Sequence, residues 1–370
     1  MLLDRRLIKN FDFYLVLLLL ALCGVGMLTL YSATHGMSDI PDPFYYLRRQ
    51  LLWFGIGIGV MLLICFVDYI NFQHWARYFY AVTLVLLAAV LFIGRAAKGS
   101  MRWIPLGPFD LQPSEVAKIL MIIVLAKLLA DREGKLNRFQ DLLVPLLATM
   151  VPMVLIFLQP DLGTSLVFIV LLLGLLYMAG AKRNHLLIII GAGLAAFPLL
   201  WFKLLKDYQK MRLMVFLNPD LDPTESGYQL LQSMIGIGSG GLTGKGLFNS
   251  TQVRLDFLPE HHTDFIFSVL GEEMGFLGAA GVLLLYFLLI YRILWTATQA
   301  KDQFGALICC GVAIILSFQI LVNIGMTISM MPVTGIPLPF MSYGNNALLV
   351  NLMCIGLVLN VGMRRHKIQF

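Results

Sequence analysis

The sequence contains few charged residues. Only 13% of its 370 residues are Asp, Glu, Lys or Arg, whereas 59% are hydrophobic, and the mean hydropathy is +0.83. This composition excludes an ordinary soluble domain, in which about 25% of residues are charged. Cysteines are also few and lack metal-ligand spacing; all five lie within apolar runs, as small buried hydrophobic residues do. The net charge of +6 does not indicate a nucleic-acid partner, because most basic residues cluster at the ends of apolar segments.

The sequence contains many long apolar runs. Their lengths predict an all-α integral membrane protein, a polytopic bundle of about ten transmembrane helices. The first run is too long for the hydrophobic region of a signal peptide and has many successors, so we expect it to be retained as a helix. The runs lie near 12–32, 50–68, 75–94, 113–130, 139–158, 163–181, 185–203, 263–291, 304–327 and 338–362.

The distribution of Lys and Arg predicts the orientation. In the short loops, most basic residues fall on the side of the two termini, which the positive-inside rule assigns to the cytoplasm. The chain then forms a single domain, 1–370, with a long extracytoplasmic loop, 204–262, between the seventh and eighth helices. Loops of this length usually have a function. Within it, 229–237 is predicted to form a short interfacial helix.

The segment 258–267 places ionisable groups at the start of an apolar run. A carboxylate at such a boundary is costly to desolvate, so it indicates function, and Asp264 is the candidate catalytic residue. On a helix, Asp264, Ser268, Gly271, Glu272 and Gly275 share one face. That face is predicted to line a cavity open to the outside. The alternative is helix packing through the glycines, with Glu272 satisfied by a neighbour.

Two further groups of charges need an explanation. Glu115 and Lys118 lie one helical turn apart inside an apolar run, so they form either a structural ion pair or part of a polar cavity, or both. The outer loop 95–112 carries Arg95, Lys98 and Arg102 against the single acid Asp110, contrary to the positive-inside rule. These basic residues therefore indicate a negatively charged ligand.

Six stretches together resemble the SEDS family of bacterial cell-wall polymerases, and the RodA branch (elongation) more than the FtsW branch (division). The similarity runs from about residue 12 to 362. One departure is Asn345-Asn346, where the family usually has Gly-Gly-Ser or a similar sequence. The stretches are KGSMRWI (98–104), QPSEVAK (112–118), QPDLGTS (159–165), IGSGGLTGKG (237–246), FLPEHHTDF (257–265) and PLPFMSYG (337–344).

The resemblance implies a peptidoglycan glycosyltransferase at the outer face of the bacterial cytoplasmic membrane. It implies that lipid II, a disaccharide-pentapeptide on undecaprenyl pyrophosphate, is polymerised into glycan strands during cell elongation. The family's essential Asp falls on Asp264, and an important loop Trp falls on Trp103. A carboxylate is the usual base for a sugar hydroxyl. Lys98, Arg102 and Lys245 are then predicted to bind the pyrophosphate.

The metal requirement stays open. His261, His262 and Asp264 make an awkward three-ligand site, because adjacent His side chains point apart on most backbones. A divalent cation bridging Asp264 and the substrate pyrophosphate is the favoured arrangement, since hard-cation sites often use substrate oxygens.

The resemblance also implies partners. They are lipid II and the undecaprenyl-pyrophosphate-linked glycan, a class B penicillin-binding protein as transpeptidase, and other membrane proteins of the elongation machinery. Two other functions remain open, a lipid-linked sugar flippase and a noncatalytic scaffold. A flippase would need the intramembrane Glu115 and Lys118 but no base on the outer side.

Overall fold

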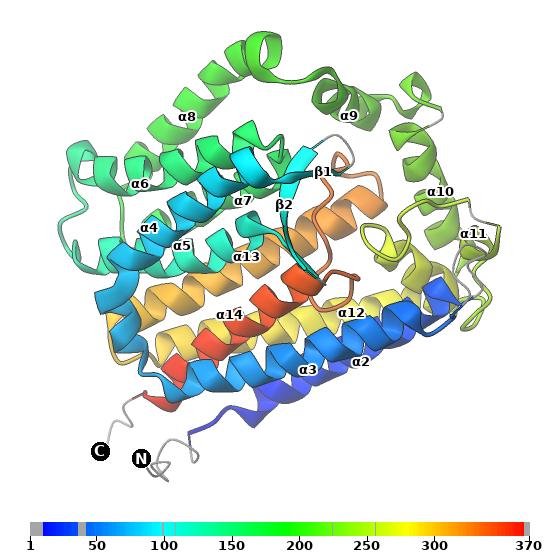
Figure 1. Ribbon diagram of the computed structural model, residues 1–370, viewed down its shortest axis with the longest axis horizontal. Coiled ribbons are helices and arrows are strands. Elements are labelled where there is room, and N and C mark those ends of the chain that lie inside the picture. The colour runs from blue at the N-terminus through cyan, green and yellow to red at the C-terminus, as the bar shows by residue number, and fades with distance from the viewer. Residues whose placement is uncertain are drawn as a thin grey trace.

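The computed structural model describes residues 10–35, 42–97, 100–107, 109–223, 225–255 and 257–365. Long helices run roughly parallel and antiparallel through the molecule, and both termini emerge at the same end (Figure 1). These helices are α2 (Phe13–Thr34), α3 (Tyr45–Phe66), α4 (Tyr69–Ile93), α5 (Pro113–Ala130), α6 (Phe139–Leu158), α7 (Leu162–Met178), α8 (Arg183–Leu199), α12 (Ile266–Thr298), α13 (Gln303–Thr327) and α14 (Asn345–Met363).

The end of the molecule away from the termini carries the remaining elements. A small antiparallel sheet of order β1-β2-β3, which the sequence analysis did not predict, joins α4 to α5. The predicted long loop, 204–262, is largely helical, and its α10 contains the short helix expected at 229–237. The bounds are β1 (Arg95–Ala97), β2 (Ser100–Leu106), β3 (Phe109–Leu111), a π-helical turn (Leu200–Leu204), α9 (Asp207–Leu217), a 3-10 turn (Pro219–Leu221), α10 (Ser226–Ser239) and α11 (Thr251–Arg254).

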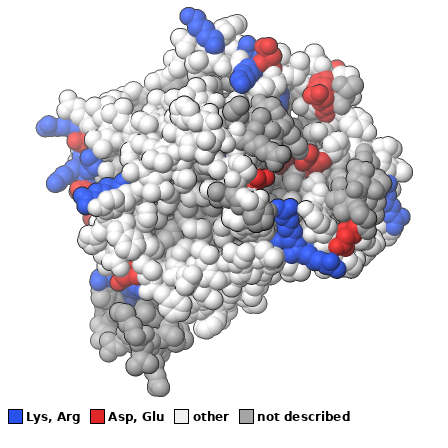
Figure 2. Space-filling model, viewed as in Figure 1, with Lys and Arg blue, Asp and Glu red and all other residues white. Residues whose placement is uncertain are grey.

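The long helices match the predicted apolar runs. Within the described ranges, eight spans are long and apolar enough to cross a membrane, where α8 is counted together with the π-helical turn that continues it to Leu204; α7, with 17 residues, is shorter. The helix α5 carries Glu115, Lys118 and Lys127, which lower its hydropathy. The polytopic helical class is therefore confirmed, whereas a count of ten spans stays a prediction. Figure 2 shows a broad area of uncharged atoms between the charged side chains at the left edge and those at and to the right of the centre, as expected for a surface in contact with lipid.

The helices α13 and α14 form the centre of the bundle, since 72% and 83% of their apolar windows are buried. The helix α8 lies at the periphery, where Leu186 is its one buried residue (Figure 1). Close packing at the centre depends on small residues. A Cβ atom at Gly57 of α3 would lie 2.3 Å from Leu352, and one at Gly356 of α14 would lie 3.0 Å from the Met61 carbonyl oxygen. Glycines at these crossings let the two helices approach, as in other membrane bundles.

The helix α12 is interrupted at Gly275, which has φ 63° and ψ −162°. The loop that precedes α12 provides hydrogen-bond acceptors for the backbone N–H groups that follow the interruption. The N–H groups of Phe276 and Leu277 donate to the carbonyl oxygens of Gly241 and Leu242, at 2.8 and 3.1 Å. A Cβ atom at Gly275 would lie only 2.3 Å from the Gly244 nitrogen, so glycine is required there. The glycine-rich stretch 237–246 therefore packs directly against a broken membrane helix.

Candidate active site

A cavity of about 610 Å³ opens at the end of the bundle away from the termini. It lies where the sheet, the starts of α5 and α7, the segment before α12 and the segment before α14 converge. Most of the lining residues are polar or charged, and many of them are residues selected from the sequence. Its charged and polar lining residues include Arg102, Trp103, Asp110, Glu115, Lys118, Asp161, Arg212, Glu260, Asp264, Gln319, Tyr343, Asn345 and Asn346.

Asp264 lies in the turn just before α12 and is held there through its backbone. Its N–H donates to the Glu260 carbonyl oxygen at 3.2 Å. Its own carbonyl oxygen accepts a 3.0 Å hydrogen bond from Asn323 Nδ2 of α13, which also donates to the Ile336 carbonyl oxygen at 2.8 Å. A Cβ atom built at Gly335 would lie 3.6 Å from Asp264 Oδ2, so the carboxylate faces that glycine. Asn323 thus joins the two segments that form this wall.

Arg102 provides positive charge near the cavity mouth. Its guanidinium lies 3.7 Å from Asp161 Oδ1 and donates through Nη2 to the Pro160 carbonyl oxygen. Tyr208 of α9 donates to the same carbonyl at 3.0 Å, which connects the outer segment to this point. Trp103 is half-buried and lines the cavity beside Arg102. The basic outer loop therefore contributes to the cavity, as its charge suggested.

Glu115 and Lys118 form the expected ion pair and also line the cavity. Lys118 Nζ lies 2.8 Å from Glu115 Oε1, and both side chains are almost fully buried. The structure thus places this buried ion pair at the border of the polar space. Pro113 lies at the first turn of α5, a position that favours the start of a helix. Glu115 and Lys118 therefore lie within the first two turns of α5, close to the cavity.

Several buried acceptor atoms on the cavity wall lack a hydrogen-bond partner within the protein. Among the residues the structure describes, these include Glu115 Oε2, Gln319 Oε1 and Asn345 Oδ1. Gln319 is only 1% exposed. Buried polar atoms are normally satisfied, so these acceptors require either water or a ligand that donates hydrogen bonds. Hydroxyl or amide groups of a sugar would meet that requirement.

Two predicted site residues lie elsewhere. Lys245 forms a 2.6 Å ion pair with Glu272, and neither lines the cavity among the described residues. Glu272 is fully buried and also accepts hydrogen bonds from Ser250 and Thr251. Lys245 is therefore paired within the protein and away from the cavity, and its contact with a phosphate stays a prediction. Lys98 lies outside the described residues.

The predicted polar face of α12 also differs from the structure. It packs against α10 instead of lining the cavity: Ser268 Oγ lies 2.6 Å from Ser233 Oγ, and a Cβ atom at Gly271 would lie 3.1 Å from Ile237. The small residues allow this close contact between helices, which is the packing alternative. Asp264 reaches the cavity because it precedes the first turn of α12.

The structure adds residues that the sequence analysis missed. Asn323 and Gln319 lie one helical turn apart on α13, in an apolar segment without a recognised motif. Asn346 Nδ2 donates to the Asp110 carbonyl oxygen at 2.8 Å, so the unusual Asn345-Asn346 pair joins α14 to β3. The departure from the family pattern at Asn345-Asn346 was the sequence signal that could have identified this contact.

Tyr343 also lines the cavity. Burial raises the pKa of Tyr343, and nearby Arg49 partly opposes the shift, so the phenol stays protonated and available as a donor.

No protein-only metal site is evident in the part of the chain that the structure describes, where no three His, Cys, Asp or Glu side chains group as ligands. His261 is buried, and its Nδ1 lies 2.7 Å from the Leu258 carbonyl oxygen. His262 instead packs its ring against Tyr46 and Tyr343. A cation near Asp264 would therefore depend on oxygen atoms from a ligand.

Known proteins resemble this chain over almost its whole length. The chain is 38% identical to peptidoglycan glycosyltransferase MrdB of Escherichia coli K12 over 360 residues, which cover 97% of this chain and 95% of MrdB. A solved structure on the coordination of polymerization and crosslinking by a peptidoglycan synthase complex matches with a TM-score of 0.82 and 34% identity, covering 96% of this chain and 99% of the other. The rod shape determining protein RodA of Thermus thermophilus matches with a TM-score of 0.73 and 34% identity, covering 96% and 98%.

The family model for FtsW, RodA and SpoVE, described as cell cycle protein, matches residues 12–367. This match spans every described helix and the whole cavity, and the solved RodA structure agrees with the predicted similarity to that branch. The chain therefore belongs to the FtsW/RodA/SpoVE family.

Proposed function

We propose that this protein is a peptidoglycan glycosyltransferase that polymerises lipid II during cell elongation, with Asp264 as the catalytic base. The observation that carries the proposal is the convergence of Asp264, Arg102, Arg212 and a set of unsatisfied acceptors on one cavity. A carboxylate can take a proton from a sugar hydroxyl, and guanidinium groups can bind a pyrophosphate. The similar proteins, a peptidoglycan glycosyltransferase and a peptidoglycan synthase complex, agree with this chemistry.

In the proposed reaction, the 4-hydroxyl of an acceptor sugar attacks the anomeric carbon of the donor. Asp264 accepts the hydroxyl proton as the new C–O bond forms. The bond between the anomeric carbon and the pyrophosphate oxygen breaks, and undecaprenyl pyrophosphate leaves with the electron pair. Arg102 and Arg212 stabilise the negative charge that develops on the leaving group. Trp103 stacks on a sugar or marks the membrane interface, and Lys98 is proposed to add to the phosphate contacts.

The polarity of the cavity suggests how the substrate lies in it. Guanidinium groups occur on its outer side, with Arg102 on β2 and Arg212 on α9. The unsatisfied acceptors of Glu115, Gln319 and Asn345 form another part of its wall. We therefore place the phosphates near the arginines and a hydroxyl-rich sugar against the acceptors.

A divalent cation between Asp264 and the pyrophosphate fits a site that is rich in carboxylates but has no complete protein ligand set in the described residues. Such an ion would supply charge neutralisation. The residues that would hold it are Asp264 and, next to it on the cavity wall, Glu260.

We further propose that the protein lies in the bacterial cytoplasmic membrane with both termini in the cytoplasm and the cavity facing outward. The distribution of basic residues supports this orientation. Reporter fusions within 131–138 should report cytoplasm, and fusions near residue 220 the outside. The reverse pattern would overturn the proposed side of catalysis.

For partners, we propose a class B penicillin-binding protein alongside other membrane proteins of the elongation machinery. The similar synthase complex, which couples polymerization and crosslinking, supports this proposal. A single-span helix of the partner is expected to dock on small residues of α12 and α13, such as Gly278, Gly281 and Ala306. Co-purification, followed by polymerisation with and without the partner, tests the complex and its activating effect separately.

The deciding experiment adds lipid II to purified protein. A polymerase yields glycan strands in detergent. A flippase instead moves labelled lipid II across a bilayer without forming polymer, and a scaffold does neither. Polymer from the wild type and none from Asp264→Asn is the expected result, and flipping without polymer would overturn the proposed reaction.

A further inference from the structure

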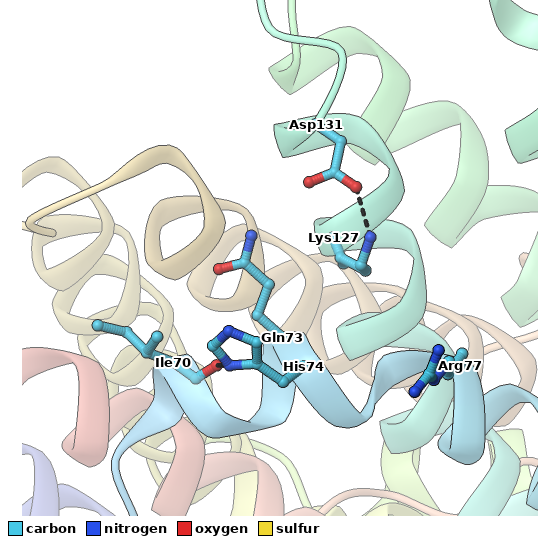
Figure 3. Close-up of a pocket in the computed structure, with 6 residues that line it drawn as sticks. All are labelled: Ile70, Gln73, His74, Arg77, Lys127 and Asp131. Atoms are coloured by element: carbon cyan, nitrogen blue, oxygen red, sulfur yellow. Dashed lines mark hydrogen bonds and ion pairs between the residues drawn. The ribbon is translucent and has the colours of Figure 1, made fainter.

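A second cavity, of about 660 Å³, lies at the end of the bundle where both termini emerge. It is separate from the candidate active site, because α5 begins at Pro113 near that site and ends at Ala130 near this one. Its walls come from the first turns of α4 and the last turn of α5 with the residue that follows (Figure 3). The lining residues are Ile70, Gln73, His74, Arg77, Lys127 and Asp131.

The cavity places two cations and one carboxylate around the same space. Lys127 Nζ lies 2.5 Å from Asp131 Oδ2, and both side chains are partly exposed. In Figure 3, this pair lies on α5 opposite Gln73 and His74 of α4. The Arg77 guanidinium lies 4.7 Å from the Tyr78 ring and donates to its hydroxyl at 2.9 Å. Tyr78 is a neutral partner, so these contacts leave the positive charge of Arg77 uncompensated.

The position of the cavity along α4 corresponds to the headgroup level of a membrane. Two aromatic side chains beside it, Trp75 and Tyr78, are 44% and 55% exposed. Exposed Trp and Tyr typically mark the membrane–water interface. Further along the same helix, Val85 and Phe92 are 65% and 87% exposed, as expected for side chains in contact with acyl chains. A ligand in this cavity can therefore extend from a polar headgroup site onto an apolar helix surface.

We propose that this cavity binds the headgroup of an aminophospholipid of the phosphatidylethanolamine class. The phosphodiester group would contact Arg77 and Lys127, and the primary ammonium would donate to Asp131, with the acyl chains along α4. A zwitterion is favoured here, because the cavity offers cationic donors to its phosphate and an anionic acceptor to its ammonium group. A choline headgroup cannot donate hydrogen bonds to the carboxylate. A purely anionic headgroup would draw Lys127 away from Asp131 without offering that carboxylate a cation in its place.

The bound headgroup would connect α4 to α5 at their ends near the termini. The two helices already pack against each other. The opposite end of α5 carries Glu115 and Lys118 of the candidate active site, and α4 leads into the strands that carry Arg102 and Trp103. The lipid would therefore stabilise the pair of helices that positions one side of that site.

The binding test uses the full-length protein and native mass spectrometry with added phosphatidylethanolamine, phosphatidylcholine or phosphatidylglycerol. The wild type is expected to retain phosphatidylethanolamine in preference to the other two lipids. The double variant Arg77→Gln/Lys127→Gln should bind it about 20- to 30-fold more weakly, since each basic residue contributes a several-fold effect at a lipid surface. Asp131→Asn should remove the preference for ethanolamine over choline while retaining the lipid phosphate.

The matched control is Lys182→Gln/Arg183→Gln, which removes two exposed basic residues at the start of α8 on the same end of the bundle. It should bind like the wild type. Equal retention of phosphatidylethanolamine by the wild type and the Arg77/Lys127 variant would overturn the site. Equal retention of all three lipids by the wild type would overturn the headgroup assignment.

Soluble O-phosphoethanolamine and inorganic phosphate distinguish a lipid from a free anion. Neither is expected to displace the lipid at equal concentration, because neither has acyl chains to contact α4. Displacement by either would assign the cavity to a soluble phosphate compound and overturn the lipid proposal. If the double variant does not remain monodisperse, the comparison of the wild type with Asp131→Asn decides the headgroup assignment alone.

Discussion

The side-chain amide of Asn323 holds the backbone of Asp264. One Nδ2 group donates both to the Asp264 carbonyl oxygen and to that of Ile336, so a single buried side chain of α13 fixes two segments of the cavity wall. Asn323 can affect catalysis without contact to a substrate. It positions the turn on which the candidate base lies and the glycine segment that this base faces.

We expect Asn323→Ala to lower both stability and polymerisation. Two carbonyl groups, one in a buried and one in a partly buried hydrogen bond, lose their donor, at a cost of about 1–3 kcal/mol. Asn360→Ala is the control, because Asn360 Nδ2 likewise donates to two carbonyl oxygens, those of Ile64 and Val67, at the other end of the bundle. Its Oδ1 also accepts from Arg364, so thermal melting should show at least as much destabilisation in Asn360→Ala, whereas the loss of lipid II turnover should be larger in Asn323→Ala. Equal turnover in the two variants would remove the positioning role.

Asp264→Asn should abolish polymerisation and leave the fold unchanged. The substitution removes the charge at nearly equal volume, and the backbone hydrogen bonds of this turn do not depend on the side chain. Size-exclusion profiles, melting temperatures and polymer yield are the measurements. Asp207→Asn, in the exposed first turn of α9, is the control and should retain activity. Polymer formation by Asp264→Asn would assign the base to another residue.

The buried pair Glu115 and Lys118 should show coupled effects. Removal of one partner leaves a buried charge unpaired, which can cost about 3–5 kcal/mol, whereas removal of both need not. Glu115→Ala is therefore expected to be less stable than Glu115→Ala/Lys118→Ala. Stability measurements on both single variants and the double variant form a double-mutant cycle. If all three are as stable as the wild type but inactive, the pair acts on the substrate instead of the fold.

Lys245→Met should affect stability more than substrate affinity. Lys245 pairs with Glu272, whose side chain is fully buried, and loss of this cation leaves the carboxylate with only neutral donors. We expect a lower melting temperature and a KM for lipid II within about twofold of the wild type. Lys210→Met, which removes a more weakly paired lysine of α9, serves as the control. A tenfold rise in KM at unchanged stability would restore Lys245 to the substrate site.

Gly275→Ala should be strongly destabilising. The added Cβ atom would lie 2.3 Å from the Gly244 nitrogen, and the positive φ is unfavourable for alanine. Gly281→Ala on the same helix has open space around it and is the control. Melting temperatures of the two variants in detergent provide the comparison. A Gly275→Ala variant as stable as Gly281→Ala would mean that α12 can straighten without its loop.

The sequence predicts those parts of the site that depend on local spacing. Glu115 and Lys118 are one turn apart on a single helix, and Asp264 stands at the boundary of an apolar run, so both were identified without tertiary information. Asn323 and Gln319 could not be identified in this way, because their importance comes from segments that meet them only after folding. The polar face of α12 was assigned to a cavity because periodicity shows which residues share a face but not what covers it. In the structure, α10 covers it.

The interruption of α12 has a consequence for biosynthesis. Backbone groups that lack partners in the hydrocarbon region are costly, so the broken helix is stable in the membrane only with its loop in place. Gly241 and Leu242, which accept from the N–H groups after the break, precede α12 in the chain. The ribosome therefore delivers the acceptors before the donors, and α12 can complete its hydrogen bonding as it enters the bilayer. A circular permutation that placed 240–246 after α12 would reverse this order and expose the break during membrane insertion.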